Sequence, residues 1–398
     1  MLDTQFPLLL HSFVQDTPPE LDGLWNIPHL WRTAVEQNLL PVLAYENKRW
    51  KLFDDPNVCR QLDGLLYGTV AANLNRCVDF ETLSASFTEH GIAHMPVKGY
   101  YLRKLYPTPE LRTFGDIDLL IHPEDRQKVH ELMLSLGYTV KQDWEPTYSY
   151  IKDAEYYEIH TNLMDGNLDG RTDLQAYFDA AWAHAEPDDW LRFRPADDFH
   201  FIYTVCHLAK HLYGGGAGLR MYLDVALYIK HKDDSLHWQA IVGEFTTLHL
   251  VDFFHIVMNA CRVWFGTKTI CPLPEPDTEA LDRLLSYTLD SDLFGHSRDH
   301  AVIELRNEKD EAPSRSRVLR KMLFPPAAEI ESRYTFLRNR HWLLPLAWFV
   351  RLFANLRLIP SRIRQMKQVT KTDMRLLSPI CWAFWRRHIE ILKAESSC

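Results

Sequence analysis

The sequence lacks the features that would place it at once in a secreted, fibrous or disordered class. Its seven cysteines include no Cys-x-x-Cys pair and no regular spacing, which argues against a disulfide framework. The first residues show no basic-then-apolar leader pattern, and no internal repeat or low-complexity tract follows. We therefore expect a reducing, cytoplasmic setting and a chain that folds over most of its length.

Long apolar runs are also missing. The most apolar stretch, residues 342–359, is interrupted by Pro345, Arg351 and Arg357, whereas a spanning helix needs roughly 18 or more uninterrupted apolar residues. We expect no transmembrane segment. The composition, 46% hydrophobic and 24% charged, is that of ordinary globular proteins. At 398 residues the chain exceeds what one hydrophobic core usually serves, so two or three packed units are expected.

Positive charge is concentrated in one stretch. The net charge is −9, yet residues 333–375 hold ten Lys or Arg and one acidic residue, so this stretch carries +9 and the remainder −18. No strong attraction of the whole protein to nucleic acid is expected. The basic, Trp-rich stretch 333–375 would suit peripheral contact with an anionic membrane, RNA or a partner, and equally the core of packed helices.

Two kinds of hydrophobic periodicity divide the chain. Apolar residues recur at helical spacing in 27–42 and 58–87, and again beyond residue 173, whereas short strand-like runs dominate between these regions. This order predicts an α+β fold, with a small mixed sheet embedded in mostly helical N- and C-terminal regions. The expected parts are 1–90, 91–172, 173–270 and 271–398. The expected strands are 92–97, 117–121, 138–141, 149–152 and 156–162, and the expected helices after them are 174–184, 197–211, 219–231, 237–247 and 251–265.

Two acids stand inside one of the strand-like runs. Asp116 and Asp118 are separated by one residue, and residues i and i+2 of a strand point to the same face of the sheet. Two neighbouring carboxylates repel each other unless a cation neutralises them. Mg²⁺ does this well, because it takes a few carboxylate oxygens and completes its coordination with water and substrate phosphates. The pair therefore predicts a Mg²⁺ or Mn²⁺ site.

A third acid and a phosphate-binding turn complete the predicted site. Glu158 lies in the next strong strand, so three carboxylates would hold two metal ions, one activating a hydroxyl and one stabilising a leaving pyrophosphate. Upstream, Lys98 and Gly99 end one strand and open a helix, where backbone N–H groups and an ammonium would meet a triphosphate.

Three histidines offer a competing site. His200, His207 and His211 are spaced by seven and four residues, which places them near one helix face, as a zinc site requires. No Glu follows the first of a His-x-x-x-His pair, so the metalloprotease pattern is absent, and packing histidines are the favoured interpretation.

Two further motifs have ordinary structural interpretations. The glycine-rich run 214–218 lacks the strand before it and the Lys-Ser/Thr after it that a phosphate loop requires, so a helix–helix connection is favoured. Arg220 and Asp224, at i and i+4, form either a helix ion pair, the favoured interpretation, or part of a substrate cleft.

Four motifs together resemble the uncharacterised nucleotidyltransferase family of the DNA polymerase β-like superfamily. They are PVKGYYLRKLY at 96–106, LRTFGDIDLLIHPED at 111–125, LGY at 136–138 and YEIH at 157–160. The likeness is strongest over residues 92–163 and continues through 207–211, 219–224 and the Phe324-Pro region into the C-terminal helices. It implies a nucleotidyltransferase core at 91–172.

By this resemblance Asp116, Asp118 and Glu158 carry over as catalytic metal ligands. The nucleotide-binding residues would be Lys98, Gly99, Arg112, Gly115 and His160. Arg112 would either hold the γ-phosphate or be a solvated loop arginine. Tyr100 follows Lys98-Gly99, where the superfamily has a Gly-Ser loop, and this is the variant expected in this family. Thr161 departs from the family pattern, because it replaces a tryptophan that often follows the histidine.

The resemblance implies transfer of a nucleoside monophosphate from an NTP, such as ATP, to a hydroxyl. The acceptor would be an unidentified small molecule, peptide or protein, and Mg²⁺ or Mn²⁺ would be the cofactor. The alternative is a catalytically inactive nucleotide-binding or regulatory module of the same fold.

Overall fold

The computed structural model describes residues 5–20, 25–164, 168, 173–214, 216–289, 324 and 340–354. The chain separates into two compact units, one made of residues 1–210 with 217–293 and the other of residues 211–216 with 294–398. The division into parts at residues 90, 172 and 270 stays a prediction.

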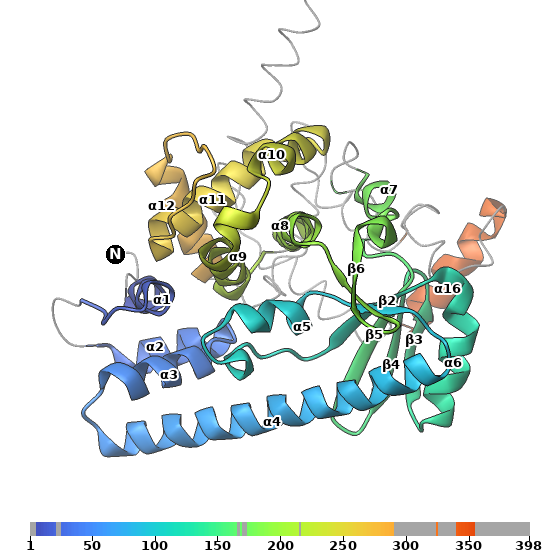
Figure 1. Ribbon diagram of the computed structural model, residues 1–398, viewed down its shortest axis with the longest axis horizontal. Helices are drawn as coiled ribbons and strands as arrows, with labels where there is room; N and C mark the ends of the chain where they lie inside the picture. The colour runs from blue at the N-terminus through green and yellow to red at the C-terminus, as the bar shows by residue number, and fades with distance from the viewer. Residues whose placement is uncertain are drawn as a thin grey trace, which may run out of the picture. The chain divides into compact units, whose positions relative to one another are not determined.

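A mixed seven-stranded sheet lies in the first unit and confirms the α+β fold class (Figure 1). Its strand order is β3-β4-β5-β2-β1-β7-β6, with β2–β5 and β1–β7 parallel and the other neighbours antiparallel. The strands are β1 His94–Pro96, β2 Ile117–Ile121, β3 Thr139–Trp144, β4 Thr147–Lys152, β5 Glu155–His160, β6 Ala185–Asp189 and β7 Arg192–Pro195.

The edge hairpin β6–β7 was not predicted. The expected helix 174–184 is instead α7 (Leu174–Phe178) and a short 3₁₀ helix (Ala181–His184), followed by β6. The hairpin residues are rich in charge and contain Pro187 and Pro195, so they show no apolar alternation. Such short, charged strands with proline are typical of sheet edges, where one side faces solvent.

One face of the sheet carries the hydrophobic core. Alternate residues of β2, including Leu119 and Ile121, and of β5, including Ile159, pack with side chains from two helices. These helices are α4 (Pro56–Glu89), which contributes its C-terminal half, and α6 (Arg126–Ser135), and both lie beside the strands in Figure 1. The residues between them along β2, such as Asp118, therefore point to the opposite face.

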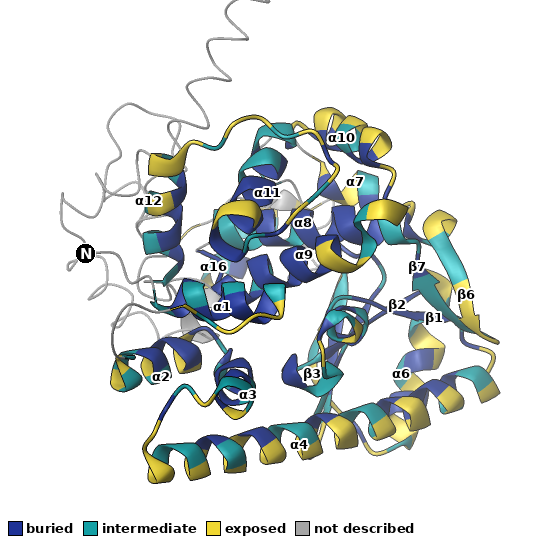
Figure 2. Ribbon diagram, turned by 60° about the vertical axis from the view of Figure 1, so that its left-hand side comes forward, coloured by how far each residue is buried: buried dark blue, intermediate teal, exposed yellow. Residues whose placement is uncertain are grey.

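Most of the remaining helices of this unit pack against one another. Figure 2 shows α9 and α11 as largely buried, whereas α4 and α10 expose one side. The side-chain amide of Gln37 joins distant helices, since its Oε1 accepts from Leu219 N at 2.6 Å and its Nε2 donates to Thr288 O at 3.1 Å. These helices are α1 Gln5–Gln15, α2 Ile27–Glu36, α3 Leu40–Trp50, α5 Gly99–Leu102, α8 Asp197–Gly214, α9 Leu219–Lys232, α10 Trp238–Thr247, α11 Val251–Phe265 and α12 Thr278–Leu289.

The second unit is described mainly over residues 340–354. A 3₁₀ helix (His341–Leu343) leads into α16 (Leu344–Ala354), in which Ala347 is buried and Leu346 exposed. Within the described residues, no helix has the length and apolarity needed to cross a membrane. Most of the basic stretch 333–375 lies outside the described residues, so its contact with a membrane, RNA or a partner stays a prediction.

Candidate active site

Strands β2 and β5 bring Asp118 and Glu158 together on the face of the sheet away from the core. Asp118 on β2 is the register partner of Glu158 on β5, and His160 follows two residues later on the same face of β5. One ligand atom from each of these three side chains lies within 4.8 Å of the others. The sequence therefore placed Asp118 and Glu158 correctly as neighbours.

Asp118 is the centre of this group. Its Oδ1 accepts from Lys98 Nζ at 2.6 Å and from His160 Nε2 at 2.8 Å. Burial alone would raise the pKa of Asp118, but the Lys98 ammonium and the bond from His160 outweigh it and hold that pKa well below its usual range. His160 Nδ1 lies 3.1 Å from the Thr147 hydroxyl, and burial lowers the pKa of the ring, so His160 is neutral at pH 7.

The pKa values of Glu158 and Asp116 are shifted in the opposite direction, upward. Burial, followed by the charges of Asp118 and Asp116, raises the pKa of Glu158 to about 7. Burial and Asp118 likewise raise the pKa of Asp116, with Lys98 opposing both shifts. More carboxylate charge is thus gathered here than Lys98 neutralises, which is the electrostatic setting that a divalent cation relieves.

The donor set fits a divalent cation. Carboxylate oxygens suit Mg²⁺, and a neutral imidazole beside them also suits Mn²⁺. Asp116 lies one residue before β2 and is not part of the compact group of Asp118, Glu158 and His160. The side chains of Lys98 and Glu158 remain 21% and 25% exposed, so the site is open on their side.

The turn at Lys98 and Gly99 has an unusual backbone. Lys98 has φ 48° and ψ −120°, a region that strongly favours glycine, so its side chain is held beside Asp118 at a conformational cost. A Cβ on Gly99 would lie 2.6 Å from Arg112 Nη1, so only glycine fits there without movement. Helix α5, which Gly99 opens, has only four residues and adds little dipole.

Arg112 is paired with a different acid, Asp224. Its Nε and Nη2 donate to the two carboxylate oxygens of Asp224 on α9, each at 2.8 Å, and the pair is buried. The Arg220–Asp224 helix pair weighed from the sequence is therefore replaced by a long-range pair. Gly115 is exposed in the loop before β2. The nucleotide-binding roles of Arg112 and Gly115 stay predictions.

A family model described as uncharacterised nucleotidyltransferase matches residues 25–266 of the chain. The chain belongs to this nucleotidyltransferase family. The matched region contains the whole sheet, the acids and helices α8 and α9, so the predicted resemblance is confirmed. Membership supports nucleotidyl transfer as the general class of activity and an NTP as substrate. No curated protein and no solved structure gives a significant match.

One side chain of the family member's site was missed from the sequence. Tyr203 on α8 is buried, interacts electrostatically with Lys98 and Asp118, and donates to Leu163 O at 3.4 Å. A tyrosine in an apolar helix gives no functional signal, so only the three-dimensional contact identifies it.

The histidine alternative is not supported. His200 is buried among Tyr101, Tyr203 and Tyr228, as an aromatic packing residue would be. Within the described ranges, the only compact group of three or more metal-ligand side chains is that of Asp118, Glu158 and His160. Gly214 is the last residue of α8, and the described residues 216–218 precede α9, which agrees with the expected helix–helix connection.

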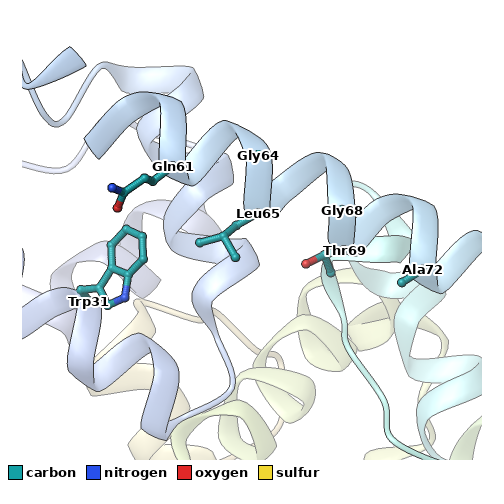
Figure 3. A pocket seen from close by; sticks show the side chains of 7 residues that line it. All are labelled: Trp31, Gln61, Gly64, Leu65, Gly68, Thr69 and Ala72. Atoms are coloured by element: carbon teal, nitrogen blue, oxygen red, sulfur yellow. The ribbon is translucent and has the colours of Figure 1, made fainter. Parts of the chain in front are cut away.

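A hollow of about 590 Å³ lies away from these acids and is lined by none of them. Figure 3 shows it between Trp31 of α2 and one side of α4. Its remaining lining residues are Gln61, Gly64, Leu65, Gly68, Thr69 and Ala72. None of the lining side chains is titratable, so the hollow offers no acid, base or metal ligand for nucleotidyl transfer.

Proposed function

We propose that this family member transfers a nucleoside monophosphate from an NTP to a hydroxyl of an acceptor, using Mg²⁺ or Mn²⁺ held by Asp116, Asp118 and Glu158. The acceptor is a small molecule, peptide or protein. The observation that carries the proposal is the register pairing of Asp118 with Glu158 beside Lys98, on the face of the sheet away from the core. A divalent cation bound there supplies Lewis-acid stabilisation of phosphate charge.

The protein's own side chains have distinct tasks in this proposal. His160 donates to Asp118 and so fixes the orientation of that carboxylate, as partners of metal ligands commonly do. Lys98, the accessible cation, neutralises phosphate oxygens of the incoming NTP. Glu158 gives up its proton to become a ligand, because a carboxylate must be ionised to bind a metal.

The test is nucleotide transfer itself. Purified protein is incubated with Mg²⁺ or Mn²⁺, each NTP in turn and a panel of acceptors, and pyrophosphate release and labelled product are measured. Activity is expected for the wild type and for Asp153→Asn, an exposed acid on the β4–β5 turn, and not for Asp116→Asn/Asp118→Asn. Full activity in the double variant would refute the assignment of the acids.

One observation favours a second candidate, a catalytically inactive nucleotide-binding or regulatory module. Lys98 already sits 2.6 Å from Asp118, so a protein cation partly fills the electrostatic role of a metal. Calorimetry with NTP in the presence and absence of Mn²⁺ separates the two. Binding that needs no metal, together with no turnover across the acceptor panel, would favour the inactive module.

A further inference from the structure

The segment 110–114, which precedes Asp116 and Asp118, is held by side chains from two helices. On one side, α4 contributes Asn73, whose Nδ2 donates to Glu110 O at 2.7 Å, and Arg76, whose Nη1 donates to Phe114 O. A backbone carbonyl bonded to a side chain loses that bond when it moves away. These two contacts fix the segment at its first and last residues.

Helix α9 holds the middle of the same segment. Arg220 Nη1 donates to Thr113 O, and Asp224 accepts from both Nε and Nη2 of Arg112. Asp224 Oδ1 also accepts from the Tyr106 hydroxyl at 2.9 Å, so both of its oxygens are bonded. Residues far apart in sequence thus meet at a segment that ends two residues before Asp116.

The Arg112–Asp224 pair is closed to solvent. Only 7% of the Arg112 side chain and 4% of the Asp224 side chain are exposed. The two parallel N–H···O bonds fix the guanidinium plane as well as its position. Arg112 Nη1 also packs against Gly99, the residue after Lys98. Arg112 therefore touches both halves of the active site, the Lys98–Gly99 turn and the segment before Asp116.

We propose that Asp224 is a positioning residue for nucleotidyl transfer: by clamping Arg112, it sets the Lys98–Gly99 turn against the segment that carries Asp116 and Asp118. This inference rests on the proposed function. Asp224 is bonded to Arg112 and Tyr106, so it acts through Arg112 and not on the substrate. Loss of the clamp leaves the acids present but less well ordered, and a loosened ligand set binds its cation more weakly.

The experiment measures Mn²⁺ affinity by calorimetry at 20 °C, together with the thermal midpoint, on the full chain. Asp224→Asn keeps the shape of the side chain but leaves the Arg112 charge uncompensated. Glu46→Gln is the matched control, because Glu46 on α3 is also a fully buried carboxylate with polar partners, Ser12 and Trp50, outside the site. Arg112→Lys is the second test variant, since it keeps the charge but loses the two-bond geometry.

We expect Asp224→Asn to weaken Mn²⁺ binding by about 10- to 100-fold, as loss of a residue that orients metal ligands typically does. Arg112→Lys should also weaken Mn²⁺ binding. If Asp224→Asn does not fold, the result for Arg112→Lys alone tests the positioning role. Glu46→Gln should bind Mn²⁺ as the wild type does, even with a comparable fall in thermal midpoint.

Two failures are distinguishable. If the wild type binds Mn²⁺ but the folded Asp224 or Arg112 variants bind it as tightly as Glu46→Gln, the clamp is only structural and this inference is wrong. If the wild type binds no Mn²⁺, the proposed function fails and the positioning role falls with it.

Discussion

Asp118 and Asp224 each bind a basic side chain within the same unit, but their surroundings differ. Both bonds to Asp118 fall on Oδ1, from Lys98 and His160, and Lys98 remains 21% exposed. Both oxygens of Asp224 are bonded, and its partner Arg112 is almost fully enclosed. The open pair is therefore suited to exchange partners with a metal and phosphates, whereas the closed pair is suited to hold backbone in place.

The largest expected effect is a loss of activity when Asp118 of the open pair and its neighbour Asp116 are both replaced. Asp116→Asn/Asp118→Asn should lower nucleotide transfer by about 1000-fold or more, because metal stabilisation of phosphate charge contributes several kcal/mol. Stability should also fall, because Lys98 and His160 lower the pKa of Asp118 and its ionised form therefore stabilises the fold at pH 7; the raised pKa of Asp116 means that replacing it offsets part of this loss. Paired activity and thermal-unfolding measurements check this, and full transfer activity in a folded double variant would contradict it.

The closed pair should affect stability more than the open pair does, because its cation is more fully enclosed. Asp224→Leu should destabilise the protein by about 3 to 5 kcal/mol, because it leaves the buried Arg112 charge unpaired. The double variant Arg112→Leu/Asp224→Leu should recover most of that stability without recovering Mn²⁺ affinity. Urea unfolding of the two variants measures the difference, and equal destabilisation of both would show that the unpaired charge is not the cause.

Substitutions at two glycines test whether the closed pair holds Arg112 rigidly beside the Lys98–Gly99 turn. Gly99→Ala should cost about 1 to 3 kcal/mol, because its Cβ would meet Arg112 Nη1, which the bonds to Asp224 prevent from moving away. Gly115→Ala is the control, since a Cβ there meets no atom within 4 Å and stability should change by less than about 0.5 kcal/mol. Equal thermal midpoints for the two variants would mean that Arg112 is not rigidly held.

The smallest expected effect is a pH dependence of metal binding at the open pair. Burial and the charges of Asp118 and Asp116 raise the pKa of Glu158 to about 7, and only its ionised form ligates. Mn²⁺ affinity should therefore rise with pH up to about 7 and fall roughly tenfold for each unit below it. Calorimetry in buffers of different ionisation enthalpy detects the released proton. Glu158→Gln should abolish that release, and a pH-independent wild type would contradict the assignment.

Local patterns predicted much of the fold and the centre of the site. Strand alternation and family motifs placed Asp118 beside Glu158, and helical periodicity located α9 and α11 to within a residue at each end. These features depend on neighbours in sequence or in adjacent strands. The charged β6–β7 hairpin did not follow, because its strands are stabilised at a sheet edge and lack an apolar pattern.

Long-range partners could not be predicted. The place of Arg112 before the acids gave no sign that it pairs with Asp224 on a helix 112 residues later. The closeness of His160 to Asp118 also depends on how β2 and β5 pair, which one sequence leaves open. A charged side chain has many chemically equivalent partners, so packing, and not local pattern, selects among them.

The most direct measurement is anomalous diffraction from crystals grown with Mn²⁺ and a nonhydrolysable NTP. The account predicts a manganese peak between Asp118 and Glu158, with the Lys98 ammonium moved onto a phosphate oxygen. The account would be contradicted by a nucleotide bound through its phosphates with no manganese at these carboxylates and with Lys98 still bonded to Asp118.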